Sequence, residues 1–222
     1  MTEVVPAILP ESYEDLSARV SRVRGLVRVV QIDIADGSYA PTETWPFSHN
    51  DHWESILHED EGLPFWEDIE YEVDMLVKNP EQYIDDWAQA GVTAAIIHIE
   101  STESFESVAD VLHERNISVG VGISPSTDIE NLEPLIEHID FIQCMGNDEI
   151  GRNGVALDER VYDKVRMLRE MYPNMPIAVD IGVNEETAPL LVEAGATKLV
   201  SGSAIFGSAD PKETITALES LG

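Results

Sequence analysis

A regular alternation of short apolar runs and longer amphipathic stretches is the feature that most limits how this chain can fold. Short runs rich in Val, Ile and Ala are typical of buried strands. Eight of them are spaced along the sequence, at 4–9, 29–35, 69–77, 93–100, 118–124, 141–146, 176–183 and 198–206. Seven stretches between and after them have the apolar spacing of amphipathic helices, at 11–26, 80–90, 103–115, 128–138, 158–172, 184–194 and 210–221.

Residues at the ends of these stretches support the helical assignment. Asp158 and Asp210 stand where the side chain of a first-turn cap is expected, and Gly91 and Gly195 follow the ends of two helices. Strict alternation of strand and helix implies parallel strands joined by right-handed crossovers. Eight such units that close on themselves predict an α/β fold, a single (β/α)8 TIM barrel over residues 1–222, with a doubly wound sheet as the alternative.

One connection breaks the pattern. Residues 38–68, between the second and third strands, are too many for an ordinary loop and contain three of the four tryptophans, with a candidate helix at 51–58. Because this insert follows the carboxyl end of a strand, we expect it on the catalytic face of the barrel. It is either a lid or an oligomer contact, or else a packed insertion.

The composition excludes several kinds of partner. The chain has 43 acidic and 13 basic residues and a net charge of −30, so nucleic-acid phosphates would be repelled. No apolar run is as long as a membrane span, and the first residues lack the basic start of a signal peptide. With a single cysteine, Cys144, the chain cannot form an internal disulfide. We expect a cytoplasmic protein that binds neither nucleic acid nor membrane.

Polar side chains recur where the predicted strands end. In a barrel, alternate residues of each strand face the interior, and those at the carboxyl ends line the active site. Asp33, Asp74 and Asp180, from the second, third and seventh strands, then converge, and buried carboxylates are costly unless paired or bound to cations. The site therefore needs a metal ion, a proton shared between carboxyl groups, or both. The other inward candidates are Gln31, Glu72, His98, Glu100, Ser124 and Met145.

The last two strands predict a phosphate site. Gly182 precedes the predicted helix at 184–194, and Gly202 and Ser203 are small residues that allow a ligand to approach the backbone. Loops after the seventh and eighth strands form the usual phosphate site of such barrels. The loop 146–154 is ambiguous, because Arg152 would attract a phosphate whereas its two acidic residues would repel one.

Several motifs together resemble one family. They are PAIL at 6–9, QIDIADG at 31–37, VDMLVKNPEQYI at 73–84, IIHIE at 96–100, GVGISPST at 120–127, VDIGVNEETAPLLVEAGA at 179–196 and SGSAIFG at 201–207. With these motifs the chain resembles the ribulose-phosphate 3-epimerases, metal-dependent members of the ribulose-phosphate-binding barrels. The resemblance implies an isomerase that epimerises a ketose phosphate through a metal-stabilised enediolate, and it is compatible with a homo-oligomer.

The resemblance also implies roles for particular residues. Asp33 and Asp180 match the family's aspartates that bind the metal and transfer protons. The family's two histidine ligands correspond to Gln31 and Asp74, so the predicted ligand set is Gln31, Asp33, Asp74 and Asp180. Such an all-oxygen set suits Mg²⁺ or Mn²⁺ better than Zn²⁺ or Fe²⁺. The residues expected to contact the sugar phosphate are Gly182, Gly202, Ser203, Met145, His98 and Arg152.

Two other functions stay open. A non-catalytic barrel that binds a phosphorylated metabolite would explain the loss of both metal histidines and the acidic loop after the sixth strand. A related sugar-phosphate lyase or decarboxylase would need a lysine two residues after Asp74, where this chain has Leu76.

Overall fold

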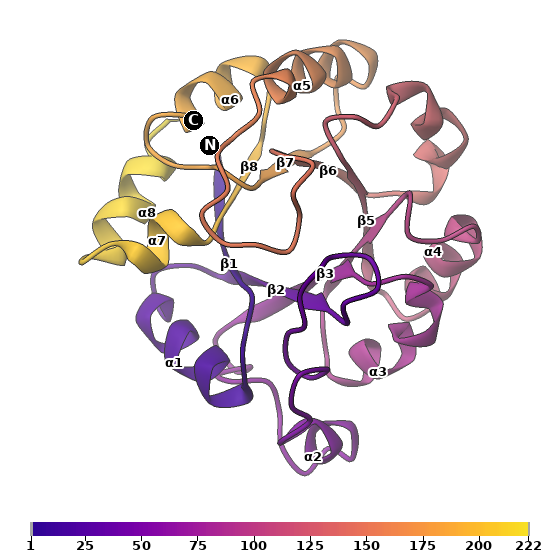
Figure 1. Ribbon diagram of the computed structural model, residues 1–222, viewed down its shortest axis with the longest axis vertical. Coiled ribbons are helices and arrows are strands. Elements are labelled where there is room, and N and C mark those ends of the chain that lie inside the picture. Colours follow the sequence, from indigo (N-terminus) through magenta and orange to yellow (C-terminus); the bar gives the residue numbers. More distant parts are fainter. Residues whose placement is uncertain (1, 222) are drawn as a thin grey trace.

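The computed structural model describes residues 2–221, and its eight strands are all parallel and form a closed barrel in chain order. The predicted single (β/α)8 TIM barrel is therefore confirmed. Figure 1 looks down on this barrel, with the strands at the centre and the helices around them. The strands are β1 (Glu3–Ile8), β2 (Val29–Ala35), β3 (Glu70–Leu76), β4 (Ala94–His98), β5 (Ser118–Ile123), β6 (Phe141–Met145), β7 (Ile177–Asp180) and β8 (Lys198–Ser201).

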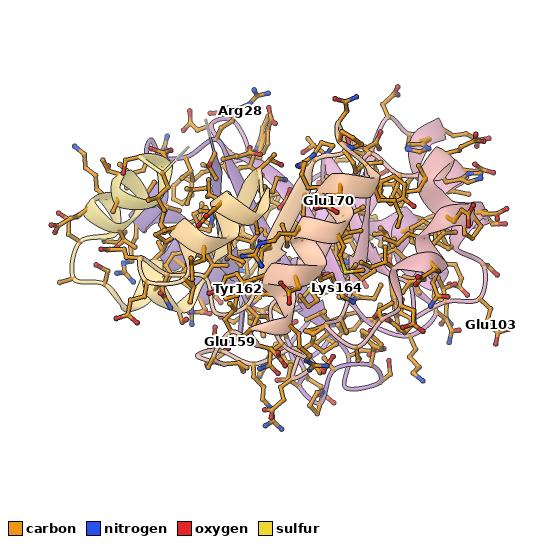
Figure 2. The ribbon with its side chains drawn as sticks, turned by 90° about the horizontal axis from the view of Figure 1, so that it is seen from above. Arg28, Glu103, Glu159, Tyr162, Lys164 and Glu170 are labelled. Atoms are coloured by element: carbon orange, nitrogen blue, oxygen red, sulfur yellow. The ribbon has the colours of Figure 1, made fainter. Side chains whose placement is uncertain are left out.

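The helices cover the outside of the barrel and bury their apolar faces against it. They are α1 (Tyr13–Val23), α2 (Trp53–Leu57), η1 (Pro80–Gln82), α3 (Ile84–Gln89), α4 (Phe105–Glu114), η2 (Ile129–His138), α5 (Arg160–Met171), α6 (Ala188–Ala194), α7 (Ser203–Gly207) and α8 (Pro211–Glu219). Figure 2 gives a side view, in which Arg28, just before β2, lies near the top and Glu159, just before α5, lies in the lower half of the molecule. None of the described helices combines the length and apolarity needed to cross a membrane.

Several of the predicted elements differ from the structure in their bounds or helix type. The last apolar run does not continue as a strand to residue 206, because β8 ends at Ser201 and the chain turns at Gly202 into α7. The helix predicted at 184–194 begins only at Ala188, and the stretch at 128–138 is a 3₁₀ helix that contains Pro134. The strand predicted at 93–100 ends at His98, so Glu100 lies outside the barrel interior.

The side chains inside the barrel are unusually polar. Outward-facing residues of the strands form the main apolar core with the helices, whereas several fully or largely buried polar groups from different strands face one another inside. They include Gln31, Asp33, Glu72, Asp74, His98, Gln143 and Asp180. Since polar groups are costly to bury without partners, this interior is shaped by hydrogen bonds rather than by apolar packing alone.

An ion pair fills the amino end of the barrel. The Nζ atom of Lys198, on β8, lies 2.7 Å from Oε2 of Glu72, on β3. The same ammonium lies 4.8 Å from the ring centre of Phe141, on β6. Burial raises the pKa of Glu72, although Lys198 opposes this rise. Side chains from three strands thus meet at this end and close it.

The insert between β2 and β3 divides into two parts. Trp45 and Trp53 pack with Trp87 of α3, with ring centres 4.7–6.1 Å apart, so this part lies outside the ring of strands. Residues 38–44 instead lie near the barrel mouth, where the side chain of Ala40 contacts the loop after β6. In Figure 1 both this segment and the loop between β6 and α5 cross the view of the barrel opening.

Candidate active site at the carboxyl end of the barrel

Three aspartates meet at the carboxyl ends of the strands. Asp33 and Asp74 are register partners on β2 and β3, and Asp180 ends β7. One carboxylate oxygen from each lies within 4.8 Å of the others. All three are buried, with exposed fractions of 4%, 0% and 7%. The structure thus brings together the three carboxylates that strand alternation predicts.

Gln31 connects two of these aspartates. Its Nε2 donates to Oδ1 of Asp33 at 2.7 Å and to Oδ2 of Asp180 at 3.1 Å. Its Oε1 is buried and accepts no hydrogen bond from any described residue. Rotation of the Gln31 side-chain amide by half a turn would exchange Nε2 and Oε1 and place the oxygen beside Asp33 and Asp180. Such amide orientations are assigned from hydrogen bonding.

Burial makes Asp33 and Asp180 hard to ionise. Burial and then the neighbouring Asp180 and Asp74 carboxylates raise the pKa of Asp33 well above its usual value. Burial and Asp74 raise the pKa of Asp180 to about 7, against smaller lowering contributions from the Ile181 N–H and Gln31. Without a cation, this pair therefore retains protons at pH values where ordinary aspartates are ionised.

Asp74 has different neighbours. Its Oδ1 lies 2.8 Å from Nε2 of His98 on β4, and its Oδ2 accepts from Nε2 of Gln143 on β6 at 3.2 Å. Burial lowers the pKa of His98, but the Asp74 carboxylate outweighs this, and the pKa is raised overall. His98, expected to contact the substrate, is instead bonded to Asp74 and does not line the cavity at the mouth.

Gln143 was not among the predicted site residues. It lies two residues before Met145 on β6, so the alternation that places Met145 inside the barrel places Gln143 there as well. That signal was present in the sequence.

The donor set fits a divalent cation with a preference for oxygen ligands. Three carboxylates within reach of one point, with an amide beside them, are hard oxygen donors of the kind that bind Mg²⁺ or Mn²⁺. The barrel interior also has fewer basic than acidic groups, since four carboxyl groups face Lys198 and His98 among the described residues. A dication, or protons on the carboxyl groups, would reduce this excess of negative charge.

One cavity joins these carboxylates to the predicted phosphate site. It comprises about 480 Å³ of empty space, part of which is open to solvent. Asp33 and Asp180 lie on its wall with Gly182, Gly202, Ser203 and Arg152, and Met145 and Leu76 also line it. All the predicted site residues except Gln31, Asp74 and His98 therefore border the same space.

Two glycines of the cavity lining are required by close packing. Gly182 has φ of 74°, and a Cβ atom there would lie 2.8 Å from Cα of Leu157. A Cβ at Gly202 would lie 2.8 Å from the carbonyl oxygen of Ala7. Side chains larger than hydrogen do not fit at either place, because the backbone of the β7 and β8 loops packs closely against Leu157 and Ala7.

The acidic residues of the β6–α5 loop are held away from this cavity. Asp148 accepts hydrogen bonds from the backbone and hydroxyl of Ser126 and pairs with Arg160 at 2.7 Å, and these partners lower its pKa. Glu149 is exposed and does not line the cavity, whereas Arg152 does, and a Glu149 carboxylate oxygen lies 3.9 Å from Nη1 of Arg152. The loop thus offers the cavity a cation whose charge Glu149 partly offsets.

Comparisons with known proteins agree with this architecture. A family model described as "Ribulose-phosphate 3 epimerase family" matches residues 3–206. Ribulose-phosphate 3-epimerase of Schizosaccharomyces pombe is 28% identical over 97% of this chain and 92% of its own length. The enzyme of the same name from Bacillus subtilis is 28% identical over 98% of both chains. The crystal structure of 3-hexulose-6-phosphate synthase from Salmonella typhimurium shares the fold, with a TM-score of 0.72 at 17% identity over 100% of this chain and 98% of that one.

Proposed function

The chain belongs to the ribulose-phosphate 3-epimerase family, and from this premise we propose that it epimerises a ketose phosphate, ribulose 5-phosphate or a close relative. Asp33 and Asp180 act as the acid–base pair, and a bound divalent cation assists them. The observation that carries the proposal is the single cavity that both carboxyl groups share with the glycine-lined loops after β7 and β8.

The phosphate of the substrate would bind at the loops after β7 and β8. Backbone N–H groups near Gly182 and Gly202 suit an anion, and both glycines line the cavity. Arg152, on the opposite loop, adds a positive charge to the same cavity. Binding the phosphate here directs the carbon chain of the substrate toward Asp33 and Asp180.

Epimerisation next to a ketone requires two groups that exchange protons with one carbon. One carboxylate removes the proton from one face, and the other, in its acid form, returns a proton to the opposite face. Asp33 and Asp180 come from β2 and β7, with β1 and β8 between them in the closed barrel. Their raised pKa values favour a state in which one carboxyl group is ionised and the other protonated, as this step requires.

A divalent cation, when bound, would stabilise the negative charge that develops on the ketone oxygen as the proton leaves. Asp33, Asp74 and Asp180 would hold it with their carboxylate oxygens, and Gln31 with its amide oxygen after rotation. The all-oxygen set favours Mg²⁺ or Mn²⁺ over Zn²⁺ or Fe²⁺.

The cavity gives less support to a lyase or decarboxylase. Among the described residues that line it there is no lysine to deliver a proton, and Leu76 of β3 occupies part of its wall.

The test is proton exchange in deuterated water. The purified protein, with Mg²⁺ or Mn²⁺, is incubated with ribulose 5-phosphate, and NMR follows deuterium at carbon 3 and the formation of the 3-epimer. We expect both in the wild type, and a loss of at least about a hundredfold in Asp33→Asn and in Asp180→Asn. A substrate that binds without exchange or epimerisation, with each metal, would contradict the proposal and favour the non-catalytic barrel.

A further inference from the structure

The two hydrogen bonds to Asp74 point to positioning residues that the family comparison does not name. We propose that His98 and Gln143 hold the Asp74 carboxylate in the orientation that binds the divalent cation, and that Gly122 provides the space for the His98 ring. This inference rests on the proposed function, because it assigns residues to the cation site of that function.

The His98 side chain makes one hydrogen bond, and the neighbouring strand β5 limits the space for its ring. Its side chain is fully buried, and Nε2 lies 2.8 Å from Oδ1 of Asp74. Its Nδ1 has no hydrogen-bond partner within residues 2–221. A Cβ atom at Gly122 of β5 would lie only 2.8 Å from Cε1 and Nδ1 of the ring. The imidazole therefore occupies space that exists because residue 122 is glycine, and Asp74 is its only hydrogen-bonding partner there.

Gln143 approaches Asp74 from β6. It is fully buried, and its Nε2 donates to Oδ2 of Asp74 at 3.2 Å. Its Oε1 accepts no hydrogen bond from the described part of the chain. Leaving one end of a buried amide unpaired costs free energy. The hydrogen bond to Asp74 offsets part of the cost of burying this side chain.

Together the two donors fix the plane of the Asp74 carboxylate. Each oxygen accepts one hydrogen bond, so rotation about the Cβ–Cγ bond would weaken both at once. Each oxygen retains a further lone pair, and one oxygen lies within 4.8 Å of the Asp33 and Asp180 oxygens. A carboxylate oriented by buried donors on one side and free on the other is arranged as a metal ligand.

Asp74 also differs from the acid–base pair in its access to substrate. Asp33 and Asp180 line the cavity, whereas Asp74 is fully buried and does not. Proton transfer to a substrate carbon requires direct contact, which Asp74 lacks. We therefore assign Asp74 to binding the cation, with His98 and Gln143 acting through it.

Calorimetric titration of the metal-free protein with Mn²⁺ tests this assignment. Gln143→Leu and His98→Phe keep the approximate volume but remove the donors. We expect each to bind Mn²⁺ roughly ten- to a hundredfold more weakly. His98→Gln, whose amide can replace Nε2 as a donor, should restore most of the affinity. Gly122→Ala should weaken binding because it displaces the ring.

The matched control is Cys144→Ala. Cys144 is buried next to Gln143 on β6 but belongs to the outer apolar core. The control should lower the melting temperature and leave the Mn²⁺ affinity unchanged, which is the result that a purely structural role of His98 and Gln143 would also give. Activity of Gln143→Leu should recover at high Mn²⁺ concentration, since the residue acts through the cation.

Two results would overturn the proposal. Folded Gln143→Leu and His98→Phe variants with wild-type Mn²⁺ affinity would exclude the positioning role while leaving the proposed function intact. If those variants do not fold, Gln143→Asn, which withdraws the donor by one methylene, decides the question by the same measurement. A wild-type protein that binds neither Mn²⁺ nor Mg²⁺ would exclude both the positioning role and the cation of the proposed function.

Discussion

Asp33 and Asp180 are buried in surroundings where ionising their carboxyl groups costs free energy. They share one amide donor, Gln31, and burial raises the pKa of both, with further contributions from Asp180 and Asp74 to Asp33 and from Asp74 to Asp180. An ordinary aspartate in water is ionised above pH 4 or so. At neutral pH, the metal-free protein therefore either retains protons on these groups or bears the cost of ionising them.

Asp180→Asn should stabilise the metal-free protein while it abolishes epimerisation. The pKa of Asp180 is raised from its ordinary value of 3.8 to about 7 in the folded state. The stability associated with its protonated form is thus present below about pH 4 and is lost as pH rises through about 7. The amide cannot ionise, so the gain in melting temperature should be several degrees at pH 8 and smaller at pH 5.

Thermal unfolding in the presence of a chelator measures this effect. Asp110→Asn, at an exposed position on α4, is the control for the general benefit of removing one negative charge. A gain at pH 8 no larger than that of the control, or a gain equal at both pH values, would contradict the assignment of a buried, proton-retaining carboxyl group.

At the scale of elements, two loops from opposite sides of the barrel contact each other over its mouth. Ala40, in the segment after β2, touches Gly151 of the β6–α5 loop, and Ile150 and Ala40 belong to one apolar cluster with Met145. The same β6–α5 loop lines the cavity through residues 151–155. A change in this contact therefore alters the wall of the site without altering its carboxylates.

Gly151→Ala should lower the catalytic efficiency of the enzyme several-fold while it changes the melting temperature only slightly. Gly151 has φ of 72°, and a Cβ atom there would lie 2.6 Å from the Cβ of Ala40, so the loops must separate. We expect KM for the ketose phosphate to rise about threefold to tenfold, equivalent to about 1 kcal/mol, with a shift of only a few degrees in melting temperature. Gly154→Ala is the control, since its φ is 74° but a Cβ there meets no atom within 4 Å. Equal effects of the two substitutions would show that backbone strain, and not the contact with Ala40, is responsible.

The sequence predicts the elements of this fold better than their ends. Apolar runs identify all eight strands because each is buried on both sides, but composition alone cannot show that Gly202 ends β8 and that SAIFG forms a helix. Strand alternation also places Asp33, Asp74 and Asp180 together. It cannot show that His98 bonds to Asp74 instead of facing the cavity, because that depends on the space left by Gly122 on the neighbouring strand. The assigned roles of these residues stay predictions.

At the scale of the whole molecule, the net charge of −30 dominates the surface. Only four of the 13 basic residues are lysines, and one of them, Lys164, is mostly buried and donates to the carbonyl oxygen of Ser124; Figure 2 shows it on α5. Like charges at this density repel one another and favour the expanded chain over the folded one.

Salt should therefore stabilise the protein. Raising KCl from about 0.1 M to about 1 M shortens the screening length from roughly 10 Å to 3 Å and should raise the melting temperature by several degrees. Tetramethylammonium chloride at equal ionic strength is the control for specific cation binding. A melting temperature that is independent of either salt would show that surface repulsion contributes little to the stability.

The Lys198–Glu72 pair at the amino end of the barrel bears on how the active-site carboxyl groups exchange hydrogen isotopes with water. Because these side chains occupy that end while Asp33 and Asp180 line the cavity at the mouth, we expect the two carboxyl groups to exchange hydrogen with bulk water through the mouth. In the proposed reaction a bound sugar phosphate would fill the mouth during turnover. The hydrogen removed from the substrate would then stay on its carboxyl group until the product departs, and the hydrogen delivered to the product would be one drawn from water before binding. Each catalytic cycle would thus place one hydrogen from water in the product and leave one hydrogen from the substrate on a carboxyl group.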